Sequence, residues 1–382
     1  MKKLFISFLL FIITTGCWNY KELNDYALVT GMALDYKNNK YEVSLLIANG
    51  NKQEENKAQI TVSSAKGKTI YEALKNISLS NPKEIYISHL SVIVISEDLA
   101  RKGLDSILDL LIRETQSHQN FYVVIAKDSL AKDILSILDP LSEYPSQNIT
   151  SSIKNTEQNQ GRITDASFNT FLGKILEKGI EPVANSIILI GDEKEGTSIE
   201  KQESSKLRNY TKLDNLAIFK EDKLVTWATE KESIGINLLL NNINTFYLNI
   251  PCNEKNLVLI SNKYKLKNII EKDKITIDIK SEGFINENAC NIDFNNTKEV
   301  KKIEKKAENM INEYTNLAIA KAKKYKTDIF GFGNQIYHKY PKYYKEINDW
   351  NEIFPKLEIK INVDYKIKNI GASRKSIKSI EE

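Results

Sequence analysis

The first residue in this 382-residue chain with an evident chemical role is Cys17. It follows a short apolar stretch from Leu4 to Ile13, which itself follows the basic pair Lys2-Lys3, and the small residue Gly16 stands directly before it. A basic start, a short apolar run and a small residue before a cysteine form the pattern of a bacterial lipoprotein signal. The sequence therefore predicts that residues 1–16 are a signal peptide and that the Cys17 thiol carries the lipid of the mature protein.

The apolar stretch is too short to cross about 30 Å of hydrocarbon as a helix. We therefore expect a protein that is anchored to a membrane and does not span it. Thr14 departs from the usual leucine three residues before the cysteine. An ordinary secretory signal, in which Cys17 is incidental, is the alternative.

The two other cysteines are Cys252 and Cys290, which lie 38 residues apart in sequence. Disulfides persist in exported proteins, so this pair is a candidate for a bridge. Two free thiols are the alternative, since sequence alone gives no geometry.

Residue patterns that perform catalysis are not found in the sequence. The histidines, His89, His118 and His338, have no second histidine or cysteine at metal-ligand spacing. Gly331-Phe332-Gly333 is a single G-x-G without the third glycine of a nucleotide-binding loop, and it is interpreted as a turn. The formal net charge of +4 includes Lys2 and Lys3, so the mature chain is nearly neutral. These observations predict a non-enzymatic protein with no metal, no cofactor and no nucleic-acid partner.

The elements expected in the first half alternate between strands and helices. Tyr26–Tyr36 and Tyr41–Asn49 are predicted to form a hairpin around a polar turn. From Lys68 to Ile190 short apolar strands and helical patterns follow one another, which favours an α/β unit. Within that stretch Ser142–Thr164 is polar and rich in Asn and Gln, and it is expected to be a loop.

The second half is predicted to contain hairpins, a long helix and a final strand. Thr297–Tyr325 has apolar residues at three- and four-residue steps, which indicates a helix that packs on a sheet. Leu357–Ile367 alternates apolar and polar residues, as a half-buried strand does. The fold class expected is α+β (mixed α/β) and multi-domain, with mixed or antiparallel sheets packed with helices. The predicted parts are the signal peptide 1–16, an N-terminal region 17–190, a linker 191–206, a C-terminal domain 207–372 and a polar tail 373–382.

Several motifs resemble one known family. Cys17-Trp18-Asn19-Tyr20-Lys21-Glu22-Leu23, followed by Val29-Thr30-Gly31-Met32-Ala33-Leu34-Asp35, is similar to the start of Ger(x)C-type spore germination lipoproteins. The resemblance continues in order through Gly67–Ala73, His89–Val92, Leu99–Gly103 and Leu216–Phe219, and ends with Asp328–Gly333, His338 and Trp350. Asn19 stands where the family often has an acidic residue.

The resemblance implies a role, a location and partners. It implies the C subunit of a GerA-type nutrient germinant receptor, held on the outer face of the spore inner membrane through lipidated Cys17. The partners implied are the membrane-integrated A and B subunits. A substrate-binding lipoprotein of an ABC transporter is the alternative, which would show two similar lobes of repeated βαβ units, and a cell-wall enzyme is a third class, for which no motif is found.

Overall fold

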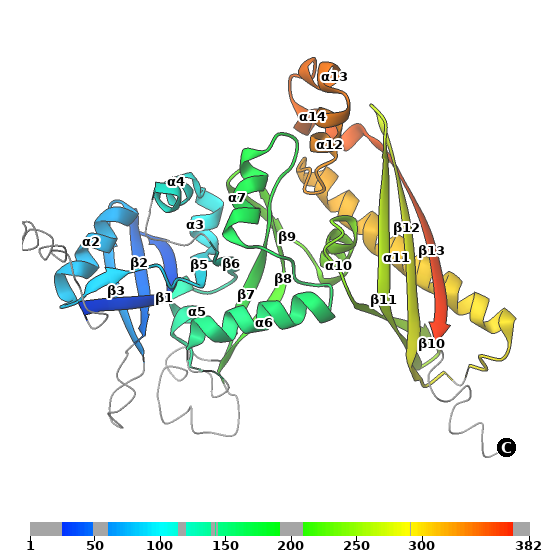
Figure 1. The fold of residues 1–382 in the computed structure, drawn as a ribbon, viewed down its shortest axis with the longest axis horizontal. Helices are drawn as coiled ribbons and strands as arrows, with labels where there is room; N and C mark the ends of the chain where they lie inside the picture. The colour runs from blue at the N-terminus through cyan, green and yellow to red at the C-terminus, as the bar shows by residue number, and fades with distance from the viewer. Residues whose placement is uncertain are drawn as a thin grey trace, which may run out of the picture.

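The computed structural model describes residues 25–48, 60–113, 120–138, 142, 144–191, 209–290 and 292–369. Cys17, the signal peptide, residues 192–206 of the predicted linker and the tail 373–382 lie outside the described residues. The described chain is elongated and contains two separate sheets (Figure 1). This agrees with the predicted mixed α/β class with more than one sheet.

The elements run in the following order. The strands are β1 (Tyr26–Lys37), β2 (Lys40–Ala48), β3 (Ile60–Gly67), β4 (Glu84–Tyr86), β5 (Val92–Ser96), β6 (Tyr122–Ala126), β7 (Val183–Ile190), β8 (Tyr210–Lys220), β9 (Lys223–Trp227), β10 (Phe246–Cys252), β11 (Lys255–Ile270), β12 (Lys274–Asn288) and β13 (Glu358–Asn369). The helices are α2 (Ile70–Ser80), α3 (Glu97–Lys102), α4 (Asp105–Arg113), α5 (Ala131–Ser136), α6 (Pro145–Asn159), α7 (Phe168–Leu176), α10 (Glu230–Leu239), α11 (Thr297–Tyr325), α12 (Phe332–Lys339), α13 (Pro341–Lys345) and α14 (Trp350–Ile353), with a 3₁₀ turn at Phe354–Lys356.

The larger sheet has the strand order β3-β2-β1-β5-β6-β7-β8-β9, with β4 beside β1. Its centre is parallel, because β1, β5, β6 and β7 run in one direction, and each end is an antiparallel hairpin. The predicted hairpin of β1 and β2 is confirmed, and its turn residues Asn38 and Asn39 adopt the left-handed conformation that such a turn requires. β7 and β8 flank the predicted linker and are antiparallel neighbours in this one sheet.

Helices cover both faces of the larger sheet. α2, α3, α4 and α7 bury their apolar side chains on one face, and α5 and α6 bury theirs on the other. The central strand β5 is apolar throughout except for its last residue and is buried on both faces, as expected for a covered parallel strand. The result is a three-layer arrangement that fixes the positions of the strand ends.

The prediction that Ser142–Thr164 is a loop is wrong, because the structure places α6 at Pro145–Asn159. Pro145 begins this helix, and Ile149 and Ile153 lie one turn apart and are buried on the sheet. Only these two apolar residues mark its buried face. The periodic signal in the sequence is therefore too weak to distinguish a helix from a polar loop.

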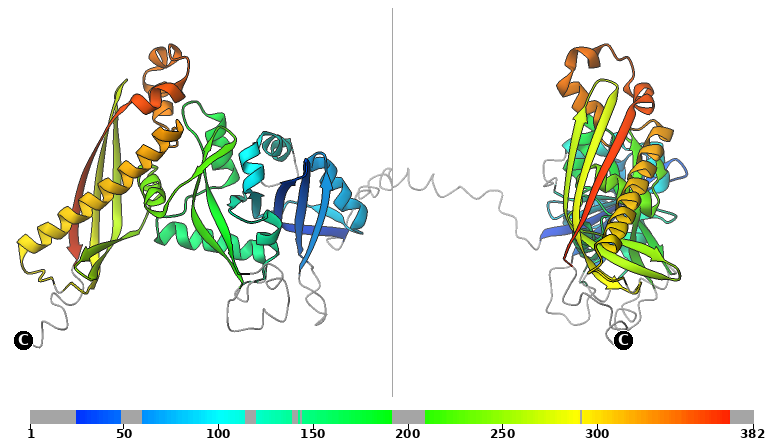
Figure 2. Two further views of the ribbon diagram at one scale, coloured as in Figure 1. Left: turned by 180° about the vertical axis from the view of Figure 1, so that it is seen from behind. Right: turned by 90° about the vertical axis from the view of Figure 1, so that its right-hand side faces the viewer.

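The smaller sheet has the order β10-β11-β12-β13, with β13 parallel to β12 and the other pairs antiparallel. β12 is one continuous strand of 15 residues. α11 has the bounds predicted from the sequence and runs along this sheet (Figure 2). Its residues Ile303, Ala307 and Ile311 are buried in a core shared with the sheet. This confirms the predicted packing of the long helix.

The outer edge of β13 is covered by two acidic side chains from α11. Glu304 Oε1 accepts a hydrogen bond from the backbone N–H of Ile367 at 3.0 Å, and Glu308 Oε1 accepts one from Tyr365 at 3.5 Å. The final strand therefore has part of its open edge satisfied from within the chain.

Candidate functional site

The structure places the candidate site residues in different parts of the chain. Cys17 lies outside the described residues. Cys252 at the end of β10 and Cys290 just after β12 lie side by side, with their Cα atoms 5.9 Å apart. His89 and His338 are exposed, and His118 lies outside the described residues. In the described part of the chain, no group of three or more His, Cys, Asp or Glu residues is placed to hold a metal ion.

The C-terminal motif Asp328–Gly333 forms one of the contacts between the larger sheet and the C-terminal half. We call this region the joint and define it by Gly179–Pro182 before β7, Phe219–Glu221 at the end of β8, Thr327–Asn334 between α11 and α12, and Trp350. All of these segments come from elements that pack in the same part of the molecule (Figure 1).

The carboxylate of Asp328 is the centre of the joint. Its Oδ1 accepts hydrogen bonds from the backbone N–H groups of Phe330 and Phe332, both at 3.2 Å. Its Oδ2 accepts from the backbone N–H of Gly333 at 2.7 Å and from the indole Nε1 of Trp350 at 2.9 Å. The side chain is fully buried, so these four donors replace water around the charge. This geometry holds the loop, the start of α12 and Trp350 together.

Backbone hydrogen bonds connect the joint to the larger sheet. The N–H of Glu181 donates to the carbonyl of Asp328 at 2.9 Å, and the N–H of Asn334 donates to the carbonyl of Gly179 at 2.9 Å. The Thr327 hydroxyl donates to the carbonyl of Phe219 at 2.6 Å. The two halves of the chain are therefore joined by directional bonds between segments far apart in sequence.

Glycine is required at two positions of the joint. A Cβ atom on Gly333 would lie 2.5 Å from Cε2 of Trp350 and 2.9 Å from the Cα of Gly179. Gly331 is the N-cap residue of α12 and has φ +71°. Residues other than glycine rarely adopt this left-handed conformation. The prediction that Gly331-Phe332-Gly333 is a turn is confirmed in that the segment turns the chain into a helix.

Two buried acids in the joint have raised pKa values. Burial raises the pKa of Glu181 to about 7, although its carboxylate accepts a hydrogen bond from the backbone N–H of Glu221. Burial also raises the pKa of Asp328 to about 6, against the opposing effect of its donors. In each case the loss of water around the charge outweighs the hydrogen bonds.

The N-terminal motifs are likewise used to position elements. Asp35 at the end of β1 accepts hydrogen bonds from the N–H groups of Ala131 at 2.8 Å and Lys132 at 3.0 Å, and so caps α5. The Ser91 hydroxyl and backbone N–H both donate to the carbonyl of Thr30, at 2.8 Å and 3.0 Å, beside a bulge in β1. A Cβ on Gly31 would lie 2.8 Å from Cδ1 of Leu135, so α5 packs against a bare backbone here.

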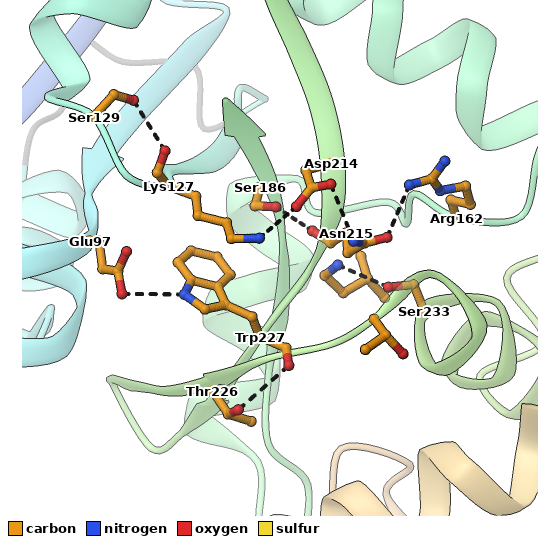
Figure 3. A network of polar contacts seen from close by, with 12 residues as sticks. Glu97, Lys127, Ser129, Arg162, Ser186, Asp214, Asn215, Thr226, Trp227 and Ser233 are labelled. Atoms are coloured by element: carbon orange, nitrogen blue, oxygen red, sulfur yellow. Dashed lines mark hydrogen bonds and ion pairs between the residues drawn. The ribbon is translucent and has the colours of Figure 1, made fainter. Parts of the chain in front are cut away.

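A second polar network fixes the edge hairpin β8–β9 to the rest of the larger sheet (Figure 3). The indole of Trp227 donates to Glu97 at 3.2 Å, and the ammonium of Lys127 lies 5.6 Å from the Trp227 ring centre and 2.8 Å from Asp214. Arg162 extends the network by donating to Asn215 at 3.1 Å. These contacts join α3, the end of β6 and the loop before α7 to one hairpin.

A cleft of about 270 Å³ lies between the start of α2 and α4. Several of its polar side chains already have partners, since Arg113 pairs with Asp109 at 2.9 Å and Thr69 caps α2 by accepting from Glu72. The exposed ring of Tyr71 forms one wall. The cleft therefore offers no unpaired buried group that would fix a ligand.

The polar groups of the joint act on structure, because donors within the chain satisfy both carboxylates. No nucleophile lies beside a base in the joint or in the network of Figure 3. In the described residues no helix has both the length and the apolar character to cross a bilayer. The fold and the site define a two-sheet protein whose motifs hold its halves in a fixed arrangement.

Comparison with known proteins identifies the family. Residues 19–189 match the family model described as spore germination protein N-terminal domain, and residues 214–371 match the one described as spore germination B3/GerAC like, C-terminal. Spore germination protein KC of Bacillus subtilis is 28% identical over 96% of this chain and 95% of its own length. Spore germination protein GerQC of Bacillus cereus is 24% identical over 98% of this chain and 100% of its own. The crystal structure of the GerBC protein has a TM-score of 0.54 at 18% identity and covers 92% of this chain and 100% of that chain.

The chain belongs to the GerAC family of spore germination proteins. It is a germinant receptor subunit of the Ger(x)C type, which confirms the resemblance of its motifs. The comparisons give no support to the transporter alternative. The two sheets also differ in the number of their strands and in which neighbouring strands are parallel. A substrate-binding protein would instead show two similar lobes.

Sequence reasoning named Asp328, Gly331, Gly333 and Trp350 but missed their partner segment at Gly179–Glu181. The local signal available in the sequence was a glycine, Gly179, ahead of an apolar strand; in the structure this glycine has φ +72°. The contact itself joins residues far apart in sequence, and no local pattern reveals it.

Proposed function

We propose that this protein is the lipid-anchored C subunit of a nutrient germinant receptor and acts without catalysis. Its partners are the membrane-integrated A and B subunits, and its place is the outer face of the spore inner membrane. The observation that supports this most is the ordered match of both family models over most of the chain. Family members of this type are receptor subunits, and their shared motifs are used here to build the joint.

The anchor is the acylated sulfur of Cys17 after removal of residues 1–16. The basic pair, the short apolar run and Gly16 support it, as argued from the sequence. Mass spectrometry of the native protein tests it directly. The expected result is a mature chain that begins at Cys17 with bound acyl groups, and an unmodified amino terminus upstream of Cys17 would refute the anchor.

The pairing of Cys252 with Cys290 is part of the same proposal, because an exported chain passes through an oxidising compartment. Their Cα separation of 5.9 Å lies in the normal range for a disulfide. The bridge would tie the end of β10 to the end of β12 across the smaller sheet. Peptide mapping without reduction is the test, and two alkylatable thiols in the native protein would contradict it.

The receptor role is tested in spores that carry this receptor as their only nutrient receptor. Deletion of the protein is expected to abolish the nutrient response while germination by direct chemical triggers persists. The variant Cys17→Ala is expected to reduce the nutrient response strongly, because the protein would no longer be held at the membrane. A full nutrient response in both strains would refute the proposed function.

The control for the anchor is the chemically similar change Cys252→Ala, which leaves Cys17 intact. We expect it to retain membrane fractionation, whereas Cys17→Ala moves the protein to the soluble fraction. A pulldown with the A and B subunits would then show whether the anchor or the folded part carries the assembly.

A further inference from the structure

One face of the smaller sheet is rich in lysine and lies open. Along β12 the side chains of Ile275, Ile277 and Ile279 are buried toward α11, so the residues between them point to the opposite face. That opposite face continues across β11 and β13 by the pairing register. Its charged residues are Lys263, Lys265, Lys267, Lys274, Asp278, Lys280, Glu282, Glu358, Lys360, Asp364, Lys366 and Lys368.

Half of these lysines are balanced by nearby acids. Lys274 pairs with Glu358 at 2.7 Å, Lys366 with Asp364 at 3.3 Å, and Lys263 and Lys368 both approach Glu282, at 3.4 Å and 3.7 Å. The four others have no acid within ion-pair distance and are exposed. We call Lys265, Lys267, Lys280 and Lys360 the lysine patch.

The lysine patch contains a pair of like charges. Lys265 of β11 lies directly opposite Lys280 of β12 in the register. Such a pair destabilises a sheet. Asp364 of β13 lies opposite Lys280 on its other side, so the fold offsets this repulsion only in part. An anionic surface laid against the face would offset that repulsion.

The surroundings of the lysine patch favour a lipid surface over a protein partner. Its neighbours in the same rows are the polar residues Thr276, Asp278, Asn362 and Asp364 and a single exposed apolar residue, Ile269, so the patch itself is mainly polar. Protein interfaces are depleted in lysine and usually contain an apolar or aromatic core. Lysine, a hydrated point charge on a flexible stem, suits diffuse attraction to a plane of phosphate headgroups.

We infer that the lysine patch is a docking surface for anionic phospholipid headgroups. The inference rests on the proposed membrane location of the protein. An acyl anchor raises the concentration of the face near the bilayer, so a weak electrostatic contact is enough to orient the molecule. The smaller sheet would then lie with β11, β12 and β13 against the membrane surface and with α11 on the far side (Figure 2).

The test uses the full mature chain with Cys17→Ser, so that no acyl group contributes. Its binding is measured to vesicles of phosphatidylglycerol and phosphatidylcholine, and to vesicles of phosphatidylcholine alone, at low and high salt. The patch variant carries Lys265→Gln, Lys267→Gln, Lys280→Gln and Lys360→Gln. The control variant carries Lys298→Gln, Lys301→Gln, Lys302→Gln and Lys324→Gln, four exposed lysines of α11 with the same total change in charge.

The expected result is binding to the anionic vesicles that weakens with salt and falls tenfold or more in the patch variant, which corresponds to about 1.4 kcal/mol or more. The control variant is expected to keep most of the binding. Circular dichroism and denaturation midpoints of both variants verify that they fold.

Equal binding by the two variants would overturn the inference, as would equal binding to neutral vesicles. A patch variant that keeps vesicle binding but no longer captures the A and B subunits would overturn it in favour of an acidic protein partner. None of these outcomes touches the proposed function, because germination of spores with deleted protein or with Cys17→Ala is measured separately.

Discussion

The change Gly333→Ala tests the joint most directly, because it adds one methyl group where the chain is packed against both the Trp350 indole and the Gly179 backbone. The new Cβ would lie 2.5 Å from Cε2 of Trp350 and 2.9 Å from the Cα of Gly179. Real Cβ atoms do not approach so closely, so either the indole or the Gly179 backbone must move. Neither is the free end of a flexible side chain.

The expected loss of stability has two parts. Forcing an extra carbon into a packed site costs about 1–3 kcal/mol. Displacing the indole also breaks the bond from Trp350 Nε1 to Asp328, which is 2.9 Å long, and a hydrogen bond to a buried charge contributes about 1.5–3 kcal/mol. We expect a total loss of about 3–5 kcal/mol in the free energy of unfolding. This is a large part of the 5–15 kcal/mol typical of a folded protein.

The matched control is Gly173→Ala in α7, where an added Cβ has no atom within 4 Å. Alanine favours a helix over glycine by about 0.8–1.0 kcal/mol, so this change is expected to stabilise the protein. Urea unfolding of the Cys17→Ser chain, followed by circular dichroism, gives both values. Opposite signs are expected, and a loss below about 1 kcal/mol for Gly333→Ala would refute the close-packing argument.

Three further predictions concern the joint and the disulfide. Trp350→Phe removes one of the four donors to Asp328 and is expected to lower the free energy of unfolding by about 1.5–3 kcal/mol. The control Trp227→Phe should lower it less, because the acceptor of the Trp227 indole, Glu97, is partly exposed. Equal losses would contradict the role assigned to burial. The pKa of Glu181 is raised from 4.5 to about 7, so the folded state holds this proton more tightly than the unfolded state, and the stabilisation is complete below pH 4.5 and is lost as pH rises through 7. As pH rises from acidic to mildly basic, the free energy of unfolding of Glu181→Gln should therefore increase relative to that of wild type by up to about 3 kcal/mol. If the difference between the two proteins does not change with pH, the pKa of Glu181 is not raised. Reduction of the bridge between Cys252 and Cys290 should lower the free energy of unfolding by about 2–4 kcal/mol, whereas the double variant Cys252→Ser with Cys290→Ser should not respond to reductant.

The sequence predicted elements well where one face of an element is clearly apolar. The hairpin of β1 and β2, the helix α11 and the strand β13 were all expected close to their observed bounds, because each carries a strong repeat of period 2 or 3.6. The polar helix α6 was missed because Ile149 and Ile153 are its only well-buried apolar residues. The far half of β11 carries a weaker signal, because lysines occupy every second position there and the positions between them are not all apolar.

The joint could be predicted only in part. The motif from Asp328 to Gly333 stood out, and glycines there indicated tight backbone packing. The hydrogen-bond partners of the Asp328 carboxylate could not be predicted from the sequence. Three of its donors are backbone N–H groups, whose direction depends on the local turn. The partner segment at Gly179 and Glu181 is brought in by the course of β7 across the larger sheet. Such contacts follow from topology, and local residue patterns do not encode them.

The acids that cover the edge of β13 have a consequence for how copies of this protein meet. Two copies held on one membrane, as proposed above, would collide often, and an uncovered strand edge would let them join into a continuous sheet. Here the donors of Tyr365 and Ile367 are already engaged by Glu308 and Glu304, and a second identical edge would bring its own carboxylates against these. At these two positions the β13 edge therefore offers a second copy no free backbone donor, which disfavours pairing of two such edges.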